Sequence, residues 1–319
     1  MGMASKYVWM NGSLVEFERA TVHFLTPALH YGAGVFEGIR CYDAEGGPAV
    51  FRLTDHMERL IRSARVFGFL ALPYTAAELA AAARLTVAAN GFRECYIRPM
   101  IYLTGGGWNL NVDMGEAGAG IAAWEWTNYL GANALEHGVR ANISSFTRHH
   151  PNVTMTKAKV AGNYANSFLA KTESVRLGFE EAIMLDPDGY VAECTGENLF
   201  VVRGKRVYTP SLAPVLEGIT RDSVIALARD LGFDVGEARI SRDQLYGADE
   251  VFVCGTASEV VALREIDFRV VGEGSTGPVT RALQRAYHAA ARGKHPRSSA
   301  WLEPVGEPAA TPLRKTGTD

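Results

Sequence analysis

The chain has 319 residues, of which 47% are hydrophobic and 21% charged, and its formal net charge is −3. This composition is typical of an ordinary folded protein, and the length suggests about two domains of roughly 150 residues each. The near-neutral charge argues against a nucleic-acid partner. No apolar run reaches the roughly 18 residues that span a membrane, and residues 1–10 lack the apolar segment of a secretory signal. We therefore expect a cytoplasmic protein without membrane contact.

The first part of the chain predicts a hairpin, two helices and two strands. Asn11-Gly12 is the strongest two-residue turn signal and joins the arms of the hairpin. Thr54 is the expected cap of the first helix, and Thr75 with Glu78 forms a capping box before an Ala-rich helix that ends at Gly91. In chain order the expected elements are the hairpin 7–10 and 14–17, a helix at 55–67, the Ala-rich helix, and strands at 96–103 and 121–124.

After a linker at residues 129–138 the strand pattern resumes. Thr220 is the expected cap of a helix at 221–231. The other expected elements are a strand at 139–146, a helix at 163–177, hairpins 182–185/190–193 and 198–202/206–208, a strand at 250–253 and a helix at 279–291. Strands in runs with helices between them predict an α+β fold. The expected domains are 1–128 and 139–305, followed by a disordered tail at 306–319.

Two sequence features resemble functional motifs but have ordinary structural explanations. Gly272–Gly277 matches the G-x-G-x-x-G dinucleotide fingerprint, but the chain after it has no room for a βαβ unit, so we expect a tight turn that leads into a helix. The cysteines, at positions 41, 95, 194 and 254, have no close spacing. We expect reduced packing thiols, without a disulfide framework or a metal site.

Lysine is rare in this chain, which has 25 Arg but only seven Lys, with none between Lys6 and Lys157. Only an amine can lose its proton near neutral pH and form a Schiff base, so an internal lysine such as Lys159 is a candidate for that chemistry. A codon bias that leaves a few surface lysines would give the same pattern.

The segment that opens the 221–231 helix is a candidate phosphate cradle. Gly218 lets a backbone come close, and Ile219 and Thr220 offer N–H groups at the positive end of a helix. An arginine on an earlier helix, such as Arg59, could add a bidentate partner. Taken alone, each of these features is more often that of an ordinary helix start.

Lys159, Tyr164 and Glu193 precede this cradle in the chain. An amine, a phenol, a carboxylate and a phosphate site are together what pyridoxal phosphate requires. The amine forms the Schiff base, the carboxylate keeps a proton on the pyridine nitrogen, and the phosphate site anchors the molecule.

These residues carry a resemblance to the branched-chain amino-acid aminotransferases of the fold-type IV (class IV) pyridoxal-phosphate family. The matching stretches follow the family order over residues 5–290. They are residues 31–40, 56–60, 96–99, 159–164, 193–200, 218–221 and 255–257. The resemblance implies a smaller N-terminal α/β domain and a larger C-terminal domain with a β-barrel-like core. It also implies a homo-oligomer, at least a dimer, whose small-molecule substrates are amino acids and 2-oxo acids.

The resemblance further implies the roles of the site residues. Lys159 would be the catalytic lysine, with Glu193 on the pyridine nitrogen and Tyr164 on the phenolic oxygen. The remaining cofactor-binding residues would be Arg59, Leu216, Gly218, Ile219, Thr220 and Thr256. The substrate would be bound by Tyr31, Phe36, Arg40, Tyr96, Arg98, Trp126, Tyr129 and Ala257. Within this set Arg40 orients Tyr96, and Arg98 receives the second carboxylate of glutamate.

The implied reaction moves the amino group between leucine, isoleucine or valine and 2-oxoglutarate. The alternatives are a transaminase of the same fold that acts on D-amino acids or (R)-amines, an aminodeoxychorismate lyase, and a cofactor-binding protein without turnover. Two residues depart from the family pattern. Trp108 lies in a loop that usually carries small apolar residues, and Glu217 stands beside the cradle, where we expect it to point outward.

Overall fold

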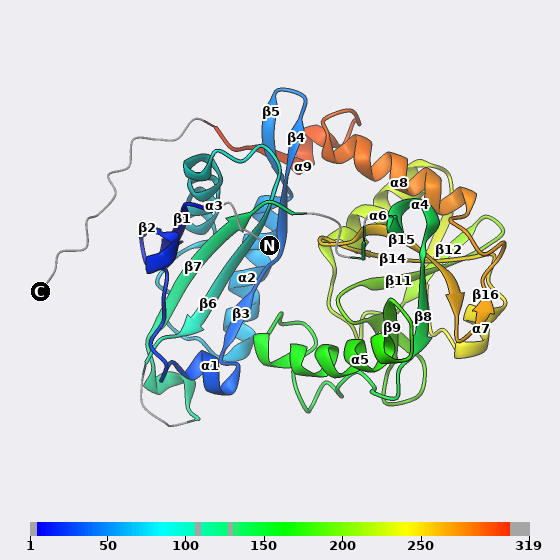
Figure 1. The fold of residues 1–319 in the computed structure, drawn as a ribbon, viewed down its shortest axis with the longest axis horizontal. Coiled ribbons are helices and arrows are strands. Elements are labelled where there is room, and N and C mark those ends of the chain that lie inside the picture. Colours follow the sequence, from blue (N-terminus) through cyan, green and yellow to red (C-terminus); the bar gives the residue numbers. More distant parts are fainter. Residues whose placement is uncertain (1–4, 106–109, 127–129, 132, 307–319) are drawn as a thin grey trace, which may run out of the picture. The chain divides into compact units, whose positions relative to one another are not determined.

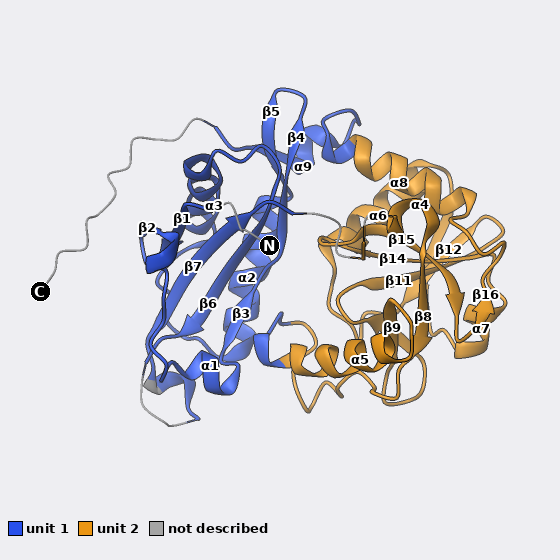
Figure 2. Ribbon diagram, viewed as in Figure 1, with its two compact units in different colours: residues 1–126, 158–162, 290–319 blue, residues 127–157, 163–289 orange. Residues whose placement is uncertain are grey.

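The computed structural model describes residues 5–105, 110–126, 130–131 and 133–306 (Figure 1). Contacts divide the chain into two compact units (Figure 2). Unit 1 comprises Met1–Trp126, Ala158–Gly162 and Ala290–Asp319, and unit 2 comprises Thr127–Lys157 and Asn163–Ala289. Ala158–Gly162 and residues 290–305 thus group with unit 1, whereas the sequence boundaries place them in the C-terminal domain. As folding domains, 1–128 and 139–305 stay a prediction.

Unit 1 is built on an eight-stranded antiparallel sheet within the described residues, in the order β17-β5-β4-β6-β7-β1-β2, with β3 paired to β6. Its strands are β1 Tyr7–Met10, β2 Ser13–Glu16, β3 Gly34–Phe36, β4 Ile39–Ala44, β5 Gly47–Phe51, β6 Cys95–Leu103, β7 Ala117–Trp124 and β17 Leu302–Pro304. Its helices are α1 Pro27–Tyr31, α2 Leu53–Phe67, α3 Ala76–Asn90 and α9 Ser298–Trp301.

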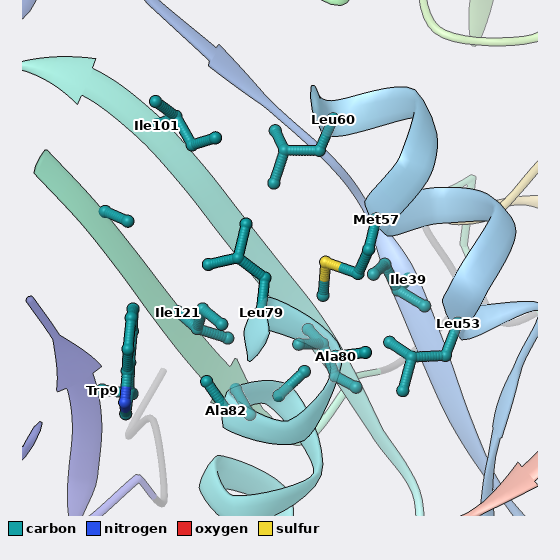
Figure 3. Packing of buried hydrophobic residues seen from close by; sticks show 14 of the residues in the cluster. Trp9, Ile39, Leu53, Met57, Leu60, Leu79, Ala80, Ala82, Ile101 and Ile121 are labelled. Carbon is teal, nitrogen blue, oxygen red and sulfur yellow. The ribbon is translucent and has the colours of Figure 1, made fainter. Parts of the chain in front are cut away.

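Helices α2 and α3 cover one face of this sheet, and the core of unit 1 lies between them and the strands (Figure 3). Met57 and Leu60 of α2 and Leu79 of α3 are at most 1% exposed. They belong to one cluster with Ile101 of β6 and Ile121 of β7. Because side chains alternate along a strand, the neighbours of these isoleucines on β6 and β7 point to the other face of the sheet.

Unit 2 holds a nine-stranded mixed sheet in its described part, in the order β10-β9-β8-β15-β14-β11-β12-β13, with β16 paired to β15. The sheet curls in the manner of a half-barrel. Its strands are β8 Val139–Ile143, β9 Glu181–Leu185, β10 Val191–Cys194, β11 Asn198–Arg203, β12 Arg206–Pro210, β13 Asp234–Ala238, β14 Glu250–Gly255, β15 Glu259–Ile266 and β16 Arg269–Val270. Its helices are α4 Ala134–His137, α5 Tyr164–Arg176, α6 Ile219–Asp230 and α7 Arg242–Tyr246, and α8 Pro278–Ala291 runs from unit 2 into unit 1.

Local sequence signals predicted some helix ends correctly and others wrongly. The capping box at Thr75 and Glu78 and the helix end at Gly91 are confirmed. The Thr54 cap is wrong, because α2 begins at Leu53 after Arg52, which has a left-handed φ of 53°. The Thr220 cap is also wrong, because Gly218 is the N-cap of α6 and Thr220 lies inside its first turn.

The expected linker at residues 129–138 contains the short helix α4, and the tail beyond residue 306 lies outside the described residues. Within the described ranges, no helix has the length and apolar character that crossing a membrane requires. The four cysteines are buried and free, as expected. Burial raises the pKa of the Cys194 and Cys254 thiols, which makes them poor nucleophiles.

Candidate active-site residues

One face of helix α2 carries polar side chains that bind a single buried carboxylate. Glu37 is fully buried directly after β3. Arg59 donates to it twice, from Nε to Oε1 at 2.6 Å and from Nη2 to Oε2 at 2.8 Å, and His56 Nδ1 lies 2.8 Å from Oε2. His56 and Arg59 are three residues apart, which places them on the same face of the helix. The guanidinium of Arg59 is therefore fixed in orientation.

Charges set the protonation state of this cluster. Burial alone would raise the pKa of Glu37, but the nearby Arg59 and His56 outweigh burial and lower it far below its usual range. Burial lowers the pKa of His56, against the opposing effect of Glu37. The cluster thus holds an ionised carboxylate against the Arg59 guanidinium, so these two charges balance.

Lys159 lies on a short segment that packs against the same part of unit 1. Its backbone N–H donates to the Ser63 hydroxyl of α2 at 3.1 Å, and its carbonyl accepts from the Phe36 N–H at 3.1 Å. Val160 forms an isolated antiparallel bridge with Val35, and Ala158 and Val160 are buried in the core. The Lys159 side chain leaves this segment between two buried neighbours, and its Nζ lies 5.0 Å from the centre of the Phe36 ring.

The sheet face away from α2 and α3 carries four of the eight predicted substrate residues, namely Phe36, Arg40, Tyr96 and Arg98. Arg40, Tyr96 and Trp124 lie directly opposite one another across β4, β6 and β7. Arg98 lies two residues beyond Tyr96 on the same face. Arg98 Nη2 donates to the Tyr96 hydroxyl at 3.2 Å, and its guanidinium carbon lies 4.7 Å from the Phe36 ring centre. The structure therefore brings Phe36, Tyr96 and Arg98 together.

Two other predicted substrate residues lie around this group. Arg40 forms an ion pair with Glu94 at 3.3 Å and stacks over the Tyr42 ring. Its role in orienting Tyr96 stays a prediction. Trp126 stacks on Tyr96 with ring centres 4.8 Å apart.

The motif around Tyr31 is explained in part by a close approach of two backbones. Tyr31 ends α1 and is 47% exposed. A Cβ on the next residue, Gly32, would overlap the backbone of Gly162, so the crossing of these two segments requires glycine. Tyr129 and Trp108, which the sequence interpretation also singled out, lie outside the described residues.

In unit 2, Glu193 lies buried on β10 within a set of three donors. Arg148 Nη2 lies 2.6 Å from its Oε1. Asn198 Nδ2 donates to Oε2 at 3.2 Å, and the Leu216 N–H approaches the same oxygen at 3.4 Å. Asn198 Nδ2 also donates to the Leu216 carbonyl at 3.1 Å. Glu193 and Leu216, two predicted cofactor residues, are thus held to each other through Asn198.

The predicted phosphate cradle lies at the first turn of helix α6. Gly218 is its N-cap, and a Cβ at that position would overlap the Asn198 Oδ1 atom, so only glycine fits. The first N–H groups of a helix have no acceptor within the helix, and those of Ile219 and Thr220 are therefore suited to an anion. Glu217 has a side chain that is 53% exposed and lies 3.9 Å from Lys157 Nζ. This agrees with the expectation that Glu217 points outward.

The remaining predicted residues of unit 2 occupy two other element ends. Tyr164 is the first residue of α5 and is half-buried. Thr256 and Ala257 lie in the turn between β14 and β15, where Gly255 pairs with Glu259. Both residues are half-buried.

The Gly272–Gly277 segment is a turn before α8, as expected. The buried Glu250 carboxylate accepts hydrogen bonds from the Val279 N–H at 2.9 Å and the Thr280 N–H at 2.8 Å. A Cβ on Gly277 would overlap this carboxylate. A protein carboxylate thus already occupies the helix end where a dinucleotide phosphate would bind.

The sequence interpretation missed the residues that hold the predicted ones. Glu37 lies inside the quoted 31–40 stretch and Asn198 inside 193–200, so the motifs themselves contained a signal for both. Arg148 and Trp124 lie outside every quoted stretch. No feature of its local sequence separates Arg148 from the other arginines.

Comparison with known proteins is consistent with this arrangement. Residues 34–266 match the family described as Amino-transferase class IV. The chain is 45% identical over 303 residues to a branched-chain-amino-acid aminotransferase of Pseudomonas aeruginosa, covering 94% of this chain and 98% of that protein.

Two solved structures are similar over nearly their whole length. The Escherichia coli branched-chain amino acid aminotransferase has a TM-score of 0.92 at 44% identity, covering 95% of this chain and 100% of that one. The branched-chain aminotransferase of Thermoproteus uzoniensis, solved with norvaline, has a TM-score of 0.90 at 45% identity, covering 95% and 100%.

Proposed function

The chain belongs to the class IV aminotransferases, and from this premise we propose that it moves the amino group between the branched-chain L-amino acids leucine, isoleucine and valine and 2-oxoglutarate. Class IV aminotransferases use pyridoxal phosphate, which supplies an electron sink that stabilises negative charge at the substrate Cα. The chain's own residues must then hold this cofactor, move a proton and select the substrate.

The residues present fit the cofactor on two observations. Gly218 is the N-cap of a 12-residue helix, whose first N–H groups have no acceptor within the helix and can donate to a phosphate. Glu193 is a buried carboxylate with a guanidinium on one oxygen, so it is suited to accept a further N–H. In this proposal Ile219, Thr220, Thr256 and Arg59 hold the phosphate, Leu216 packs on the ring, and Tyr164 binds the phenolic oxygen.

Lys159 carries the proton chemistry. Its amine acts first as a general base, which takes the proton from the substrate Cα, and then as a general acid, which gives that proton up again. The hydrogen bonds of its backbone N–H and carbonyl hold the segment in place, so that the side chain alone moves. Glu193 keeps the ring nitrogen protonated, which strengthens the electron sink during proton removal.

The observation that carries the substrate assignment is the position of the Arg98 guanidinium among aromatic rings on one sheet face. Phe36, Tyr96 and Trp126 offer apolar area to a leucine side chain, whereas Arg98 offers a partner for the second carboxylate of 2-oxoglutarate. A site that serves both half-reactions needs both kinds of group. Arg40, Tyr31, Tyr129 and Ala257 complete the proposed substrate set.

The test is a panel of half-reactions with L-leucine, D-alanine and (R)-phenylethylamine on the purified holoenzyme. We expect L-leucine to bleach the bound cofactor's absorbance fastest. Faster reaction with D-alanine or the amine would replace this proposal by the alternative substrate classes. The relatives named above all carry the name branched-chain aminotransferase.

We also propose a homo-oligomer, at least a dimer, in the cytoplasm. Exposed apolar side chains support it, because Phe168 and Leu169 of α5 are 73% and 53% exposed, and Phe24 and Leu29 are 71% and 60% exposed. Exposed apolar side chains that form a patch are typical of interaction sites, and these pairs are a candidate for such a patch on each unit. Size-exclusion chromatography with light scattering should give a molar mass of at least two chains.

A further inference from the structure

The guanidinium of Arg98 is enclosed by three aromatic rings of unit 1. Its central carbon lies 4.7 Å from the ring centre of Phe36, 5.3 Å from that of Tyr96 and 5.9 Å from that of Trp124. The strand register explains the enclosure. Tyr96 and Trp124 face each other across β6 and β7, and the residue opposite Arg98 is the small Ala122. The missing bulk at Ala122 leaves the space that the guanidinium fills.

Arg98 nevertheless keeps unused hydrogen-bonding capacity. Its Nη2 donates to the Tyr96 hydroxyl, but its Nε is buried and has no acceptor among the described residues. No acidic side chain in the described ranges forms an ion pair with it. A half-buried guanidinium without a counter-ion is poorly solvated. A ligand carboxylate would supply both the opposite charge and the hydrogen-bond acceptors.

We propose that Trp124 is a positioning residue that sets the preference of the site for acids with a second carboxylate, by holding Arg98 in place. This inference rests on the proposed function, in which Arg98 receives that carboxylate. An indole face attracts a guanidinium more strongly than a phenyl face does, and it also excludes water from one side. A ligand with an aliphatic end does not use the guanidinium, so its binding depends little on where Arg98 lies.

The test uses the holoenzyme and two unreactive acids, glutarate and 4-methylvalerate, whose dissociation constants are measured by titration calorimetry. Trp124→Leu should weaken glutarate binding about tenfold and change 4-methylvalerate binding less than about twofold. The KM for 2-oxoglutarate should rise by a similar factor, while kcat at saturation stays unchanged. Trp124→Phe should recover most of the glutarate affinity, because a phenyl face still covers the guanidinium.

Trp9→Leu is the matched control. Trp9 lies on β1 opposite Ile121 and is buried in the core on the other face of the same sheet. Its replacement should lower stability and leave the ratio of the two dissociation constants unchanged.

If Trp124→Leu weakened the binding of both acids equally, or weakened the binding of neither, the role of Trp124 would be overturned. Failure of the wild-type holoenzyme to bind either acid would instead overturn the proposed function, and this inference with it.

Discussion

Arg148 and Glu193 form a buried ion pair, with Arg148 Nη2 at 2.6 Å from Glu193 Oε1 and both side chains less than a tenth exposed. The pair joins the loop that follows β8 to strand β10. It fixes one oxygen of Glu193 and leaves the other to Asn198 and the Leu216 N–H. A carboxylate oriented in this way has a defined direction toward a ligand, which Glu193 alone on its strand would not have.

Removing Arg148 should destabilise the protein strongly. Arg148→Met leaves a buried carboxylate without its cation, which costs about 3–5 kcal/mol in the free energy of unfolding. Urea denaturation of this variant, of Glu193→Gln and of the double variant gives their coupling energy. We expect the double variant to be less destabilised than the sum of the two single ones by at least about 1 kcal/mol. Additive effects would show that the two side chains do not act as a pair.

Glu193→Gln should separate cofactor binding from chemistry. The neutral amide keeps the shape of the side chain but cannot stabilise a protonated ring nitrogen, so the half-reaction with L-leucine should slow by about 100-fold or more. Stopped-flow absorbance measures this rate, and the absorbance of the bound cofactor before mixing shows that it is still held. An unchanged rate would contradict the role given to Glu193.

Sequence reasoning succeeded where the cause is local. The box at Thr75, the turn at Asn11-Gly12 and the helix end at Gly91 depend on residues within a few positions of one another. It failed at the start of α2. Arg52, between β5 and α2, has a left-handed backbone conformation, and no sequence spacing rule indicates this.

The residues of the candidate site likewise divide into those that the sequence indicated and those that needed the structure. The scarcity of lysine and the family motifs singled out Lys159 and Glu193. Their supports depend on contacts between distant residues, such as Glu37 with Arg59, 22 positions apart, and Arg148 with Glu193. Nothing in a single sequence states which arginine meets which carboxylate, so these partners needed the structure.

Glu37→Gln should release Arg59 from its fixed orientation. The amide offers one acceptor in place of two and leaves a buried guanidinium without a counter-ion, so we expect cofactor affinity to fall roughly tenfold. Equilibrium titration of the apoprotein with pyridoxal phosphate measures this. Asp55→Asn is the control, because Asp55 lies on the same helix as Arg59 and pairs with Arg52 but is 46% exposed, and it should leave affinity unchanged. Equal affinities in wild type and Glu37→Gln would contradict the role of Glu37.

Acidification should destabilise the protein through His149. Burial, and secondly the charge of Arg148, lowers the pKa of His149 from its ordinary 6.5 to about 4. Between these values the unfolded chain binds a proton that the folded chain does not, so the free energy of unfolding falls as pH falls through this window. His149→Gln should flatten this dependence. Denaturant titrations across the window give the free energy of unfolding of the wild type and of the variant, and an identical pH dependence of the two would refute the assignment.

The most direct measurement is chemical trapping of the lysine that carries the cofactor. Reduction of the holoenzyme with borohydride, followed by digestion and peptide mass spectrometry, identifies the amine that is joined to pyridoxal phosphate. Lys157 is an internal comparison two residues earlier, where its ammonium donates to the Val215 carbonyl at 3.0 Å. We predict the label on Lys159 alone and its loss in Lys159→Ala. A label on Lys157 or on another lysine, or no label in protein that binds the cofactor, would contradict the account.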